Sequence, residues 1–226
     1  LIVLLAGEFV TGYMADEGLM SIDEGRSSSF IEDIRDAELA ITEPGNPNRT
    51  VTIHARLLEA AHSSNRYIEN PWLPFTIRVD RWFPNAALLH AHGETLATQG
   101  TGLDARAEPR PQVTGVEGAL TDTPAAYITL IREGRELGTW MVSAGLRDAQ
   151  PVATGDATLE LSLRYRRTEL PFEIHLIDFR HDTFTGTTIA RNFSSDIRLV
   201  DPVRNTDRHV RIWMNNPLRY AGMTFY

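Results

Sequence analysis

The sequence of 226 residues contains no cysteine. This absence excludes disulfides, thiolate metal sites and any thiol–disulfide chemistry carried out by these residues themselves. It does not identify a cellular compartment. Lysine is absent too, so all 22 basic residues are arginines. A coding bias accounts for this, and the alternative is that guanidinium groups were retained to bind carboxylates or phosphates.

Long apolar runs are also scarce. Residues 1–6 are purely apolar, but Glu8 soon ends the run, and a helix needs about 20 apolar residues to cross a bilayer. The run also lacks the basic leader of a signal peptide. It is therefore either a buried strand or the outer end of a membrane helix that begins upstream.

Motifs for catalysis and for nucleic-acid binding are missing. There is no Gly-x-Ser-x-Gly, no Walker loop and no dinucleotide fingerprint, so we predict no catalytic residue. The net charge is −8, and no basic stripe interleaved with aromatic residues is present, which excludes a nucleic-acid partner.

The charge is distributed unevenly along the chain. Residues 163–226 hold ten arginines and seven acids, a net of +3, whereas residues 1–162 hold twelve arginines and 23 acids, a net of −11. The acidic stretch predicts electrostatic attraction of a basic partner.

Alternating patterns predict a mainly β fold, either an antiparallel β-sandwich or a two-lobed β structure, with few short helices. The helix signals are weak, and one of them is a capping-box match at residues 29–32. Residues 90–116 are poor in pattern and predict a long loop. The expected strands cover residues 38–42, 50–58, 127–131, 137–143, 158–165, 172–179, 196–200 and 210–214.

An internal duplication is a further interpretation. Residues 73–77 (Leu-Pro-Phe-Thr-Ile) resemble residues 170–174 (Leu-Pro-Phe-Glu-Ile), and an alternating strand precedes each segment. A repeated unit would give a pseudo-symmetric structure. The alternative is that Leu-Pro is simply common where a strand begins.

Seven histidines are candidates for metal or haem ligation. His90 and His92 have the spacing that places two rings on one side of a strand, and Glu94 follows. No clear third ligand is present, so we predict no metal site, and a metal-dependent enzyme remains only a minor hypothesis. The other histidines lie at polar strand positions or near turns, where structural or solvent-exposed roles are typical.

The C-terminal segment carries a family resemblance. It contains Leu-Pro-Phe-Glu at 170–173, Asp178-Phe179, Phe-Thr-Gly-Thr at 184–187, residues 193–196, and residues 214–226 with Asn215-Asn216-Pro217-Leu218. In this order these pieces resemble the ResB family of cytochrome c biogenesis proteins. Many members have Asn-His-Pro-Leu where this chain has Asn216, so a ligand role for that histidine does not carry over.

The resemblance implies a domain organisation and a location. Residues 1–12 would be the end of a transmembrane helix, and residues 13–226 would form an extracytoplasmic ResB-like β domain with sub-lobes at 36–90 and 118–226. The chain would lie on the periplasmic face of the cytoplasmic membrane, attached through flanking helices.

The resemblance also implies a function, which is to hold apocytochrome c, the haem-handling membrane partner, or both, during haem attachment. The domain would not be an enzyme alone but part of a cytochrome c synthase complex. Haem would be bound mainly by membrane parts outside this chain. In the chain itself the arginine-rich third offers guanidinium partners for haem propionates, and we predict contacts from Arg208, His209, Arg211 and Arg219.

A different class of function remains open at this point. A generic extracytoplasmic β-sandwich module for ligand binding or adhesion would use exposed aromatic residues, and the chain has four tryptophans, Trp72, Trp82, Trp140 and Trp213. The alternative for these residues is the core of the fold.

Overall fold

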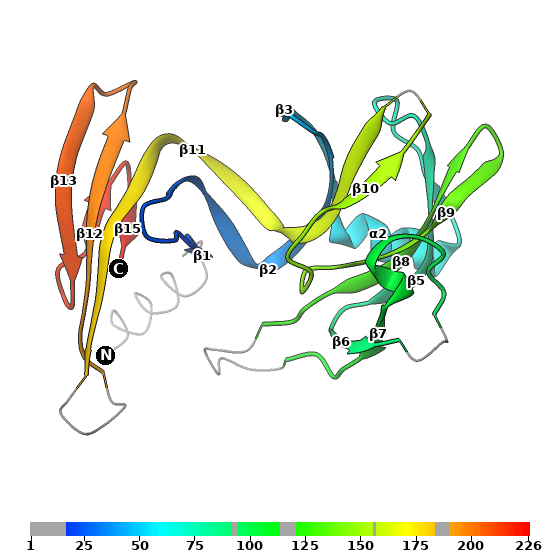
Figure 1. Cartoon of the computed structure of the whole chain (residues 1–226), viewed down its shortest axis with the longest axis horizontal. Coiled ribbons are helices and arrows are strands. Elements are labelled where there is room, and N and C mark those ends of the chain that lie inside the picture. Colours follow the sequence, from blue (N-terminus) through cyan, green and yellow to red (C-terminus); the bar gives the residue numbers. More distant parts are fainter. Residues whose placement is uncertain (1–16, 92–94, 114–120, 156, 184–189) are drawn as a thin grey trace, which may run out of the picture. The chain divides into compact units, whose positions relative to one another are not determined.

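The computed structural model describes residues 17–91, 95–113, 121–155, 157–183 and 190–226 (Figure 1). Strands dominate the described chain and their paired registers are antiparallel, which confirms the predicted mainly β fold class. Contacts divide the chain into two compact units. Unit 1 comprises residues 1–33 and 167–226, and unit 2 comprises residues 34–166. The predicted sub-lobes 36–90 and 118–226 stay a prediction, and residues 1–12 lie outside the described part.

Two long strands contribute residues to both units. They are β2 (Ser27–Glu43) and β11 (Thr158–Thr183), which are neighbours in one seven-stranded sheet. The predicted capping box at residues 29–32 is wrong, because these residues lie inside β2. A four-residue capping pattern carries too little energy to override a strand that is paired along its length.

Unit 2 is a sandwich of two sheets. In the first sheet the strand order is β4-β5-β8-β9. In the second, β3 pairs with β2, and β10 pairs with β11. A small third sheet consists of β6 and β7. The bounds are β3 (Asn46–His54), β4 (Tyr67–Ile68), β5 (Thr76–Phe83), β6 (Ala86–His90), β7 (Ala105–Pro109), β8 (Ala125–Arg132), β9 (Arg135–Ser143) and β10 (Gln150–Ala153).

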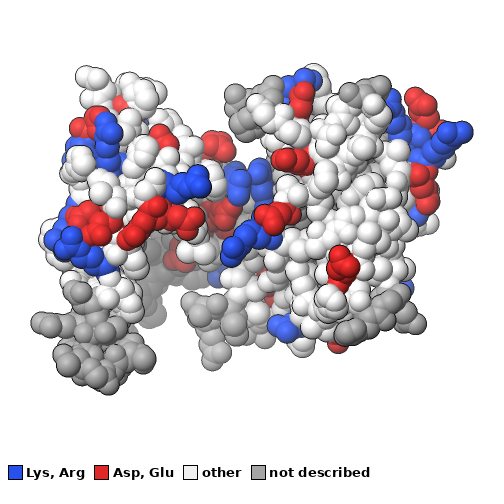
Figure 2. All heavy atoms as spheres, in the orientation of Figure 1, with Lys and Arg blue, Asp and Glu red and all other residues white. Residues whose placement is uncertain are grey.

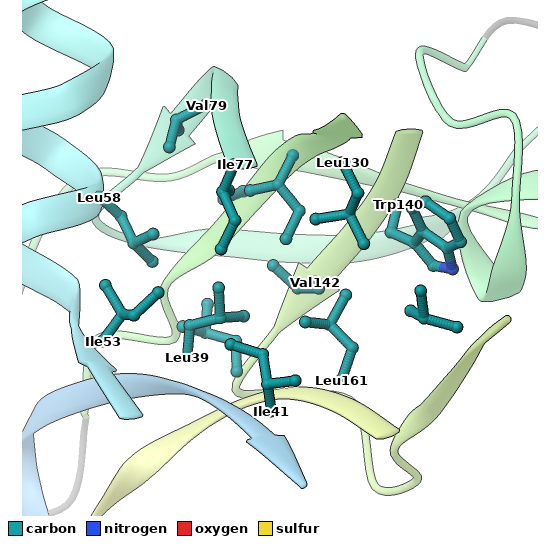
Figure 3. Close-up of a cluster of buried hydrophobic side chains, with 14 of the residues drawn as sticks. Leu39, Ile41, Ile53, Leu58, Ile77, Val79, Leu130, Trp140, Val142 and Leu161 are labelled. Atoms are coloured by element: carbon teal, nitrogen blue, oxygen red, sulfur yellow. The ribbon is translucent and has the colours of Figure 1, made fainter. Parts of the chain in front are cut away.

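The core of unit 2 lies between its two larger sheets. In Figure 3, side chains of β2 and β11 point towards side chains of β5, β8 and β9. Leu39 and Leu161 come from one sheet and Ile77 and Leu130 from the other, and all four are fully buried. Alternating apolar residues on paired strands produce this arrangement, because every second side chain points to the same face.

One helix, α2 (Ala55–Ser64), follows β3 directly. The prediction of a strand over 50–58 is therefore wrong beyond His54. The His54 side chain caps the helix by accepting a hydrogen bond from the Arg56 backbone N–H at 3.2 Å. The helix buries Leu58 and Ala61, and it ends at Asn65, whose left-handed backbone (φ 50°) allows its N–H to bond carbonyls of the last turn.

The β8–β9 hairpin agrees with its sequence pattern. Strands were expected over 127–131 and 137–143, and the structure has both, with Arg132 opposite Arg135. Glu133 and Gly134 both have positive φ, 50° and 76°, as the favoured two-residue hairpin turn requires. The long loop expected over 90–116 is wrong in part. It contains the 3-10 helix η1 (Gly100–Leu103) and β7, which pairs with β6, a pairing that the sequence Ala-Arg-Ala-Glu-Pro does not signal.

Unit 1 is built on the sheet β11-β12-β13. Besides parts of β2 and β11 it contains β1 (Gly18–Leu19), β12 (Ala190–Asp201), β13 (Thr206–Trp213), β14 (Leu218–Tyr220) and β15 (Met223–Phe225). The strand expected over 196–200 lies in β12, and the one expected over 210–214 lies in β13 except for Met214, which follows the end of that strand. Figure 1 shows β11, β12 and β13 running side by side.

A second core fills one face of this sheet. Phe172 is 2% exposed and makes edge-to-face contacts with Tyr220 and Phe225, at ring-centroid distances of 5.1 and 6.2 Å. The β14–β15 hairpin therefore packs on β11, and Ile197 and Leu199 of β12 complete the cluster. Along the edge of β11, pairing to β10 stops at Leu161 and pairing to β12 begins at Glu173. Pro171, which has no N–H, lies in that gap.

Two apolar neighbours, Leu176 and Ile177, interrupt the alternation along β11, and the register shifts there between Leu176 and Asp178. The segments compared as a duplication do not occupy equivalent elements. Leu73-Pro74 lies in the loop before β5, whereas Leu170-Pro171 lies within β11. In the described residues no helix is both long and apolar enough to span a bilayer.

Candidate functional site

The face of the β11-β12-β13 sheet opposite its core carries two of the four side chains predicted to contact haem, His209 and Arg211. His175 in β11 lies opposite Arg198 in β12, and Arg198 lies opposite His209 in β13. Directly opposed residues share a face of the sheet, so a guanidinium stands between two imidazoles. We call this surface the polar face and define it by Glu173, His175, Asp196, Arg198, Asp207, His209 and Arg211.

The central guanidinium is already paired. Arg198 donates from Nε to Oδ1 of Asp207 at 2.7 Å and from Nη2 to Oδ2 at 2.6 Å. These hydrogen bonds lower the pKa of Asp207, and the nearby His209 and His175 lower it further by charge. The pair is exposed and contributes little to stability. The pairing fixes the orientation of the Arg198 guanidinium group. This group is therefore no longer available to bind an incoming carboxylate.

The two histidines differ in their neighbours. His175 Nε2 lies 3.4 Å from Oε2 of Glu173, a contact along its own strand. His209 has no hydrogen-bond partner within the part of the chain that the structure describes. Both rings are accessible to solvent. For His175 this agrees with the polar strand position assigned from the sequence.

Arg211 extends the polar face towards the end of β13. Its Nη2 donates to Oγ of Ser194 at 3.2 Å, and its Nε lies 3.9 Å from Oδ1 of Asp196. Figure 2 shows basic and acidic atoms interspersed over β12 and β13 on the side that is drawn. The surface therefore combines both signs of charge and is not a field of one sign.

The four residues predicted to contact haem are only partly brought together. His209 and Arg211 share the polar face, because they are two residues apart on β13. Arg208 points to the other face, where its guanidinium carbon lies 5.9 Å from the centre of the Tyr220 ring. Arg219 is exposed on β14, opposite Thr224 of β15. Haem contact by these four residues stays a prediction.

Sequence reasoning missed Arg198. The alternation of Asp196 and Arg198 with the buried Ile197 and Leu199 could have placed it on the outer face. Its position between two histidines depends on the register of three strands, which the sequence pattern does not give.

The geometry of the polar face does not fit a resident haem. The polar face is the exposed surface of a sheet, whereas axial ligation requires an oriented imidazole in an enclosed pocket. The fork of Arg198 is engaged by Asp207. The described residues also include no group of three His, Asp or Glu side chains placed to hold a metal ion. The His90 motif is only half described, since residues 92–94 lie outside the described part. The polar face suits contact with a partner surface.

A second surface feature lies in unit 2. A cleft of about 680 Å³ opens between the loop before β5 and the β8–β9 turn. Glu69 and Glu133 line it, together with Pro71, Pro74 and Phe75. Trp72, in the same loop, is 82% exposed, and its backbone N–H donates to Oδ1 of Asn70 at 2.9 Å. Arg132 lines the cleft as well, so the lining carries two carboxylates and one guanidinium, which donates to the backbone carbonyl of Thr154.

The four tryptophans do not form one ligand-binding face. Trp140 is buried in the core of unit 2, and Trp82 packs against the same core. Trp213 is half-exposed on β13 of unit 1. Trp72 lies in the loop that borders the cleft of unit 2. The structure therefore gives no support to a module that uses all four rings.

Comparison with known proteins adds a family match. Residues 127–226 match the model of the ResB-like family. The whole chain is 23% identical to Protein NrfI of Wolinella succinogenes over 232 aligned positions and covers 22% of that protein. The chain thus spans about a fifth of the length of this relative. The matched segment runs from β8 to β15 and includes the complete polar face. Residues 127–226 are therefore ResB-like, which confirms the resemblance recognised in the sequence.

Proposed function

We propose that this chain is the extracytoplasmic domain of a membrane-bound factor in cytochrome c maturation, and that it holds apocytochrome c, a haem-handling partner, or both. The observation that carries the proposal is the ResB-like match over residues 127–226. The similarity of the whole chain to NrfI supports it. Attachment to the cytoplasmic membrane, on the periplasmic side, is part of the same proposal.

The chemistry of the chain suits a scaffold. It has no cysteine, so thiols of an apocytochrome would meet no competing thiol here. The polar face is broad and exposed, which suits protein contact better than enclosure of a small substrate. In this proposal the domain is not an enzyme alone and contributes to a synthase complex by positioning its partners.

In this proposal, haem is bound mainly by parts of the intact protein that lie outside this chain. When bound, haem supplies an iron that takes His or Met ligands and two anionic propionates. The role proposed for this chain is limited to arginines at the edge of such a site, Arg211 and Arg219 foremost. Each keeps a guanidinium at the surface, although Arg211 is partly engaged by Ser194 and Asp196.

The test is haem attachment to a c-type cytochrome in cells that carry the full-length protein. We expect Arg211→Ala or Arg219→Ala to reduce attachment severalfold, because each removes a cation at the haem edge or at the partner contact. His175→Ala, on the same polar face as Arg211, is the matched control and should have little effect.

Two results would contradict this proposal. One is full attachment activity in the double variant Arg211→Ala/Arg219→Ala at normal protein level. The other is a tight stoichiometric haem complex of the isolated chain that a single histidine substitution abolishes, because that would move the haem site into this domain.

A further inference from the structure

The strand β13 ends its sheet, so one of its two edges faces away from β12 (Figure 1). Its residues 206–213 pair with β12 without a register shift, and they include no proline. A regular strand edge presents a row of backbone N–H and C=O groups with which a further strand can pair. Among the strands that the structure describes, none pairs with this outer edge.

The turn after β13 shows which backbone groups point outward. The N–H and C=O of Trp213 bond the backbone of Asn216, at 3.4 and 2.8 Å, so both groups point away from β12. In an antiparallel strand each residue directs its N–H and C=O to the same side, and the side alternates along the strand. Asp207, His209 and Arg211 therefore also direct these groups to the outer edge, where the described residues supply no backbone partner.

The side chains along this edge select the strand that can pair with it. Asp207, His209 and Arg211 lie on the polar face and are exposed, whereas Arg208 and the half-buried Val210 lie on the core face. Charged side chains on an edge strand discourage pairing, because like charges directly opposite each other are destabilising. A partner strand must therefore bring the opposite charge to each of these positions.

A second copy of β13 meets this condition in one antiparallel register. When His209 lies opposite His209 of the copy, Asp207 lies opposite Arg211 of the copy, and Arg211 lies opposite Asp207 of the copy. On the core face, Arg208 then lies opposite Val210, whose side chain the long arginine stem can cover. Sliding the copy by two residues places Arg208 opposite Arg208 in one direction and Arg211 opposite His209 in the other. The charges therefore favour a single register.

The ion pairs already present on the polar face are compatible with this register. Asp207 accepts the two hydrogen bonds of Arg198, and each of its carboxylate oxygens has capacity for a further one. Arg211 directs Nη2 to Ser194 and Nε towards Asp196, and its guanidinium carries other N–H groups. Across the joined sheets, Asp196, Arg211, Asp207 of the copy and Arg198 of the copy would follow one another with alternating sign.

We propose that two copies of this chain associate through β13, whose outer edges pair antiparallel about a twofold axis at His209. The backbone groups of Asp207, His209 and Arg211 form the hydrogen bonds, and opposite charges meet at both ends of the paired segment. An unrelated extended peptide would gain the same backbone bonds but not the paired charges. Because the twofold contact uses the same edge of both copies, assembly stops at the dimer. The inference does not depend on cytochrome maturation.

The first test is sedimentation equilibrium of the 226-residue chain at about pH 8, where histidine is ordinarily neutral. We expect a concentration-dependent dimer. Arg211→Asp and Asp207→Arg each place like charges opposite one another at both ends, so each should weaken self-association by about tenfold or more. An equimolar mixture of the two variants brings opposite charges together again and should dimerise as the wild type does. Neither misfolding nor an unspecific effect of charge predicts this recovery.

A disulfide locates the axis. The chain has no cysteine, so His209→Cys supplies a single thiol that lies opposite its own copy, at a Cα separation of about 5.5 Å that a disulfide can bridge. Mild oxidation should cross-link this variant. His175→Cys is the matched control, because it lies on the same face but in β11, and it should remain monomeric under denaturing conditions.

Three results would overturn the proposal. The first is a chain that stays monomeric at every concentration reached. The second is a dimer that neither charge variant weakens, or equal cross-linking of the two cysteine variants, because the contact would then lie elsewhere. The third is protection of the β13 amides from hydrogen exchange only when an extended peptide is added to a monomeric chain, since a client strand would then be the occupant.

Discussion

Phe172 illustrates how a single residue anchors unit 1. Its sequence position, after Leu170-Pro171 at the start of an alternating run, predicts a buried ring, and the ring is 2% exposed. Tyr220 and Phe225 meet it edge to face. Phe172→Ala should therefore lower the free energy of unfolding by about 3–5 kcal/mol, because it removes a buried ring and leaves a cavity. Urea unfolding followed by circular dichroism measures this change.

The control for this prediction lies on the same strand and the same face. Phe179 is 47% exposed, so Phe179→Ala should cost about 1 kcal/mol or less. Equal effects of the two substitutions would show that the β14–β15 hairpin does not cover Phe172 in solution. Hydrogen exchange of the β11, β12 and β13 amides would assign the loss to unit 1.

At the scale of elements, Asp201 joins the β12–β13 turn to the β14–β15 hairpin. Its carboxylate is fully buried and accepts hydrogen bonds from the Arg204 backbone N–H at 2.9 Å, from Arg204 Nη1 at 2.9 Å and from the Tyr220 hydroxyl at 2.8 Å. Burial alone would raise the pKa of this carboxyl group. The three hydrogen bonds and the charge of Arg204 outweigh burial and lower the pKa to about 2.

This pKa predicts an acid-sensitive contact between the two elements. A carboxyl group whose folded pKa lies below its ordinary value of 3.8 stabilises the fold fully above that value. The contribution is lost as pH falls from about 4 towards 2. The melting temperature should fall over this range, and amides of residues 218–225 should exchange faster. Differential scanning calorimetry and hydrogen exchange measure the two effects.

Two variants isolate the contribution of Asp201. Asp201→Asn removes the titrating group, so it should lower stability at pH 7 and flatten the dependence between pH 4 and 2. Tyr220→Phe keeps the ring on Phe172 and removes only one hydrogen bond, so it should shift the acid transition of the hairpin to higher pH. An unchanged acid profile in Asp201→Asn would assign the transition to other carboxylates such as Asp207.

At the scale of the whole molecule, the negative net charge predicts that the bound polypeptide is basic. The net charge is −8, and the cleft of unit 2 is lined by the carboxylates of Glu69 and Glu133 together with the guanidinium of Arg132. If the chain holds a basic apocytochrome segment, as proposed, binding should weaken on the order of tenfold between about 0.05 and 0.5 M salt, because ions screen exposed charges. Fluorescence anisotropy of a labelled apocytochrome peptide measures this.

The cleft offers a matched test of that attraction. Glu69→Gln/Glu133→Gln keeps the shape and removes two charges, so it should weaken binding and reduce its salt dependence. Glu43→Gln, a similar change on a carboxylate paired with Arg49 at 2.9 Å, is the control. Binding that ignores both salt and the double substitution would argue against an electrostatic role for this cleft.

The sequence by itself determined the fold class and most of the strands, because alternation of apolar and polar residues directly reflects which face of a sheet is buried. The bulge at Ile177 and the turn at Glu133-Gly134 also coincide with local sequence features, a pair of apolar neighbours and a glycine between two strands. Short motifs in the C-terminal segment were sufficient for the resemblance to the ResB family.

Only the tertiary structure decided which side chains meet. The helix α2 occupies residues that were predicted to form part of a strand. Its formation is favoured because Leu58 and Ala61 lie on one face of the helix and are buried there. Arg198 came to stand between His175 and His209, and Phe179 came to stack on Phe193, through the register of strands that are distant in sequence. Register depends on pairing energy summed over whole strands and on one inserted residue, so no local pattern encodes it.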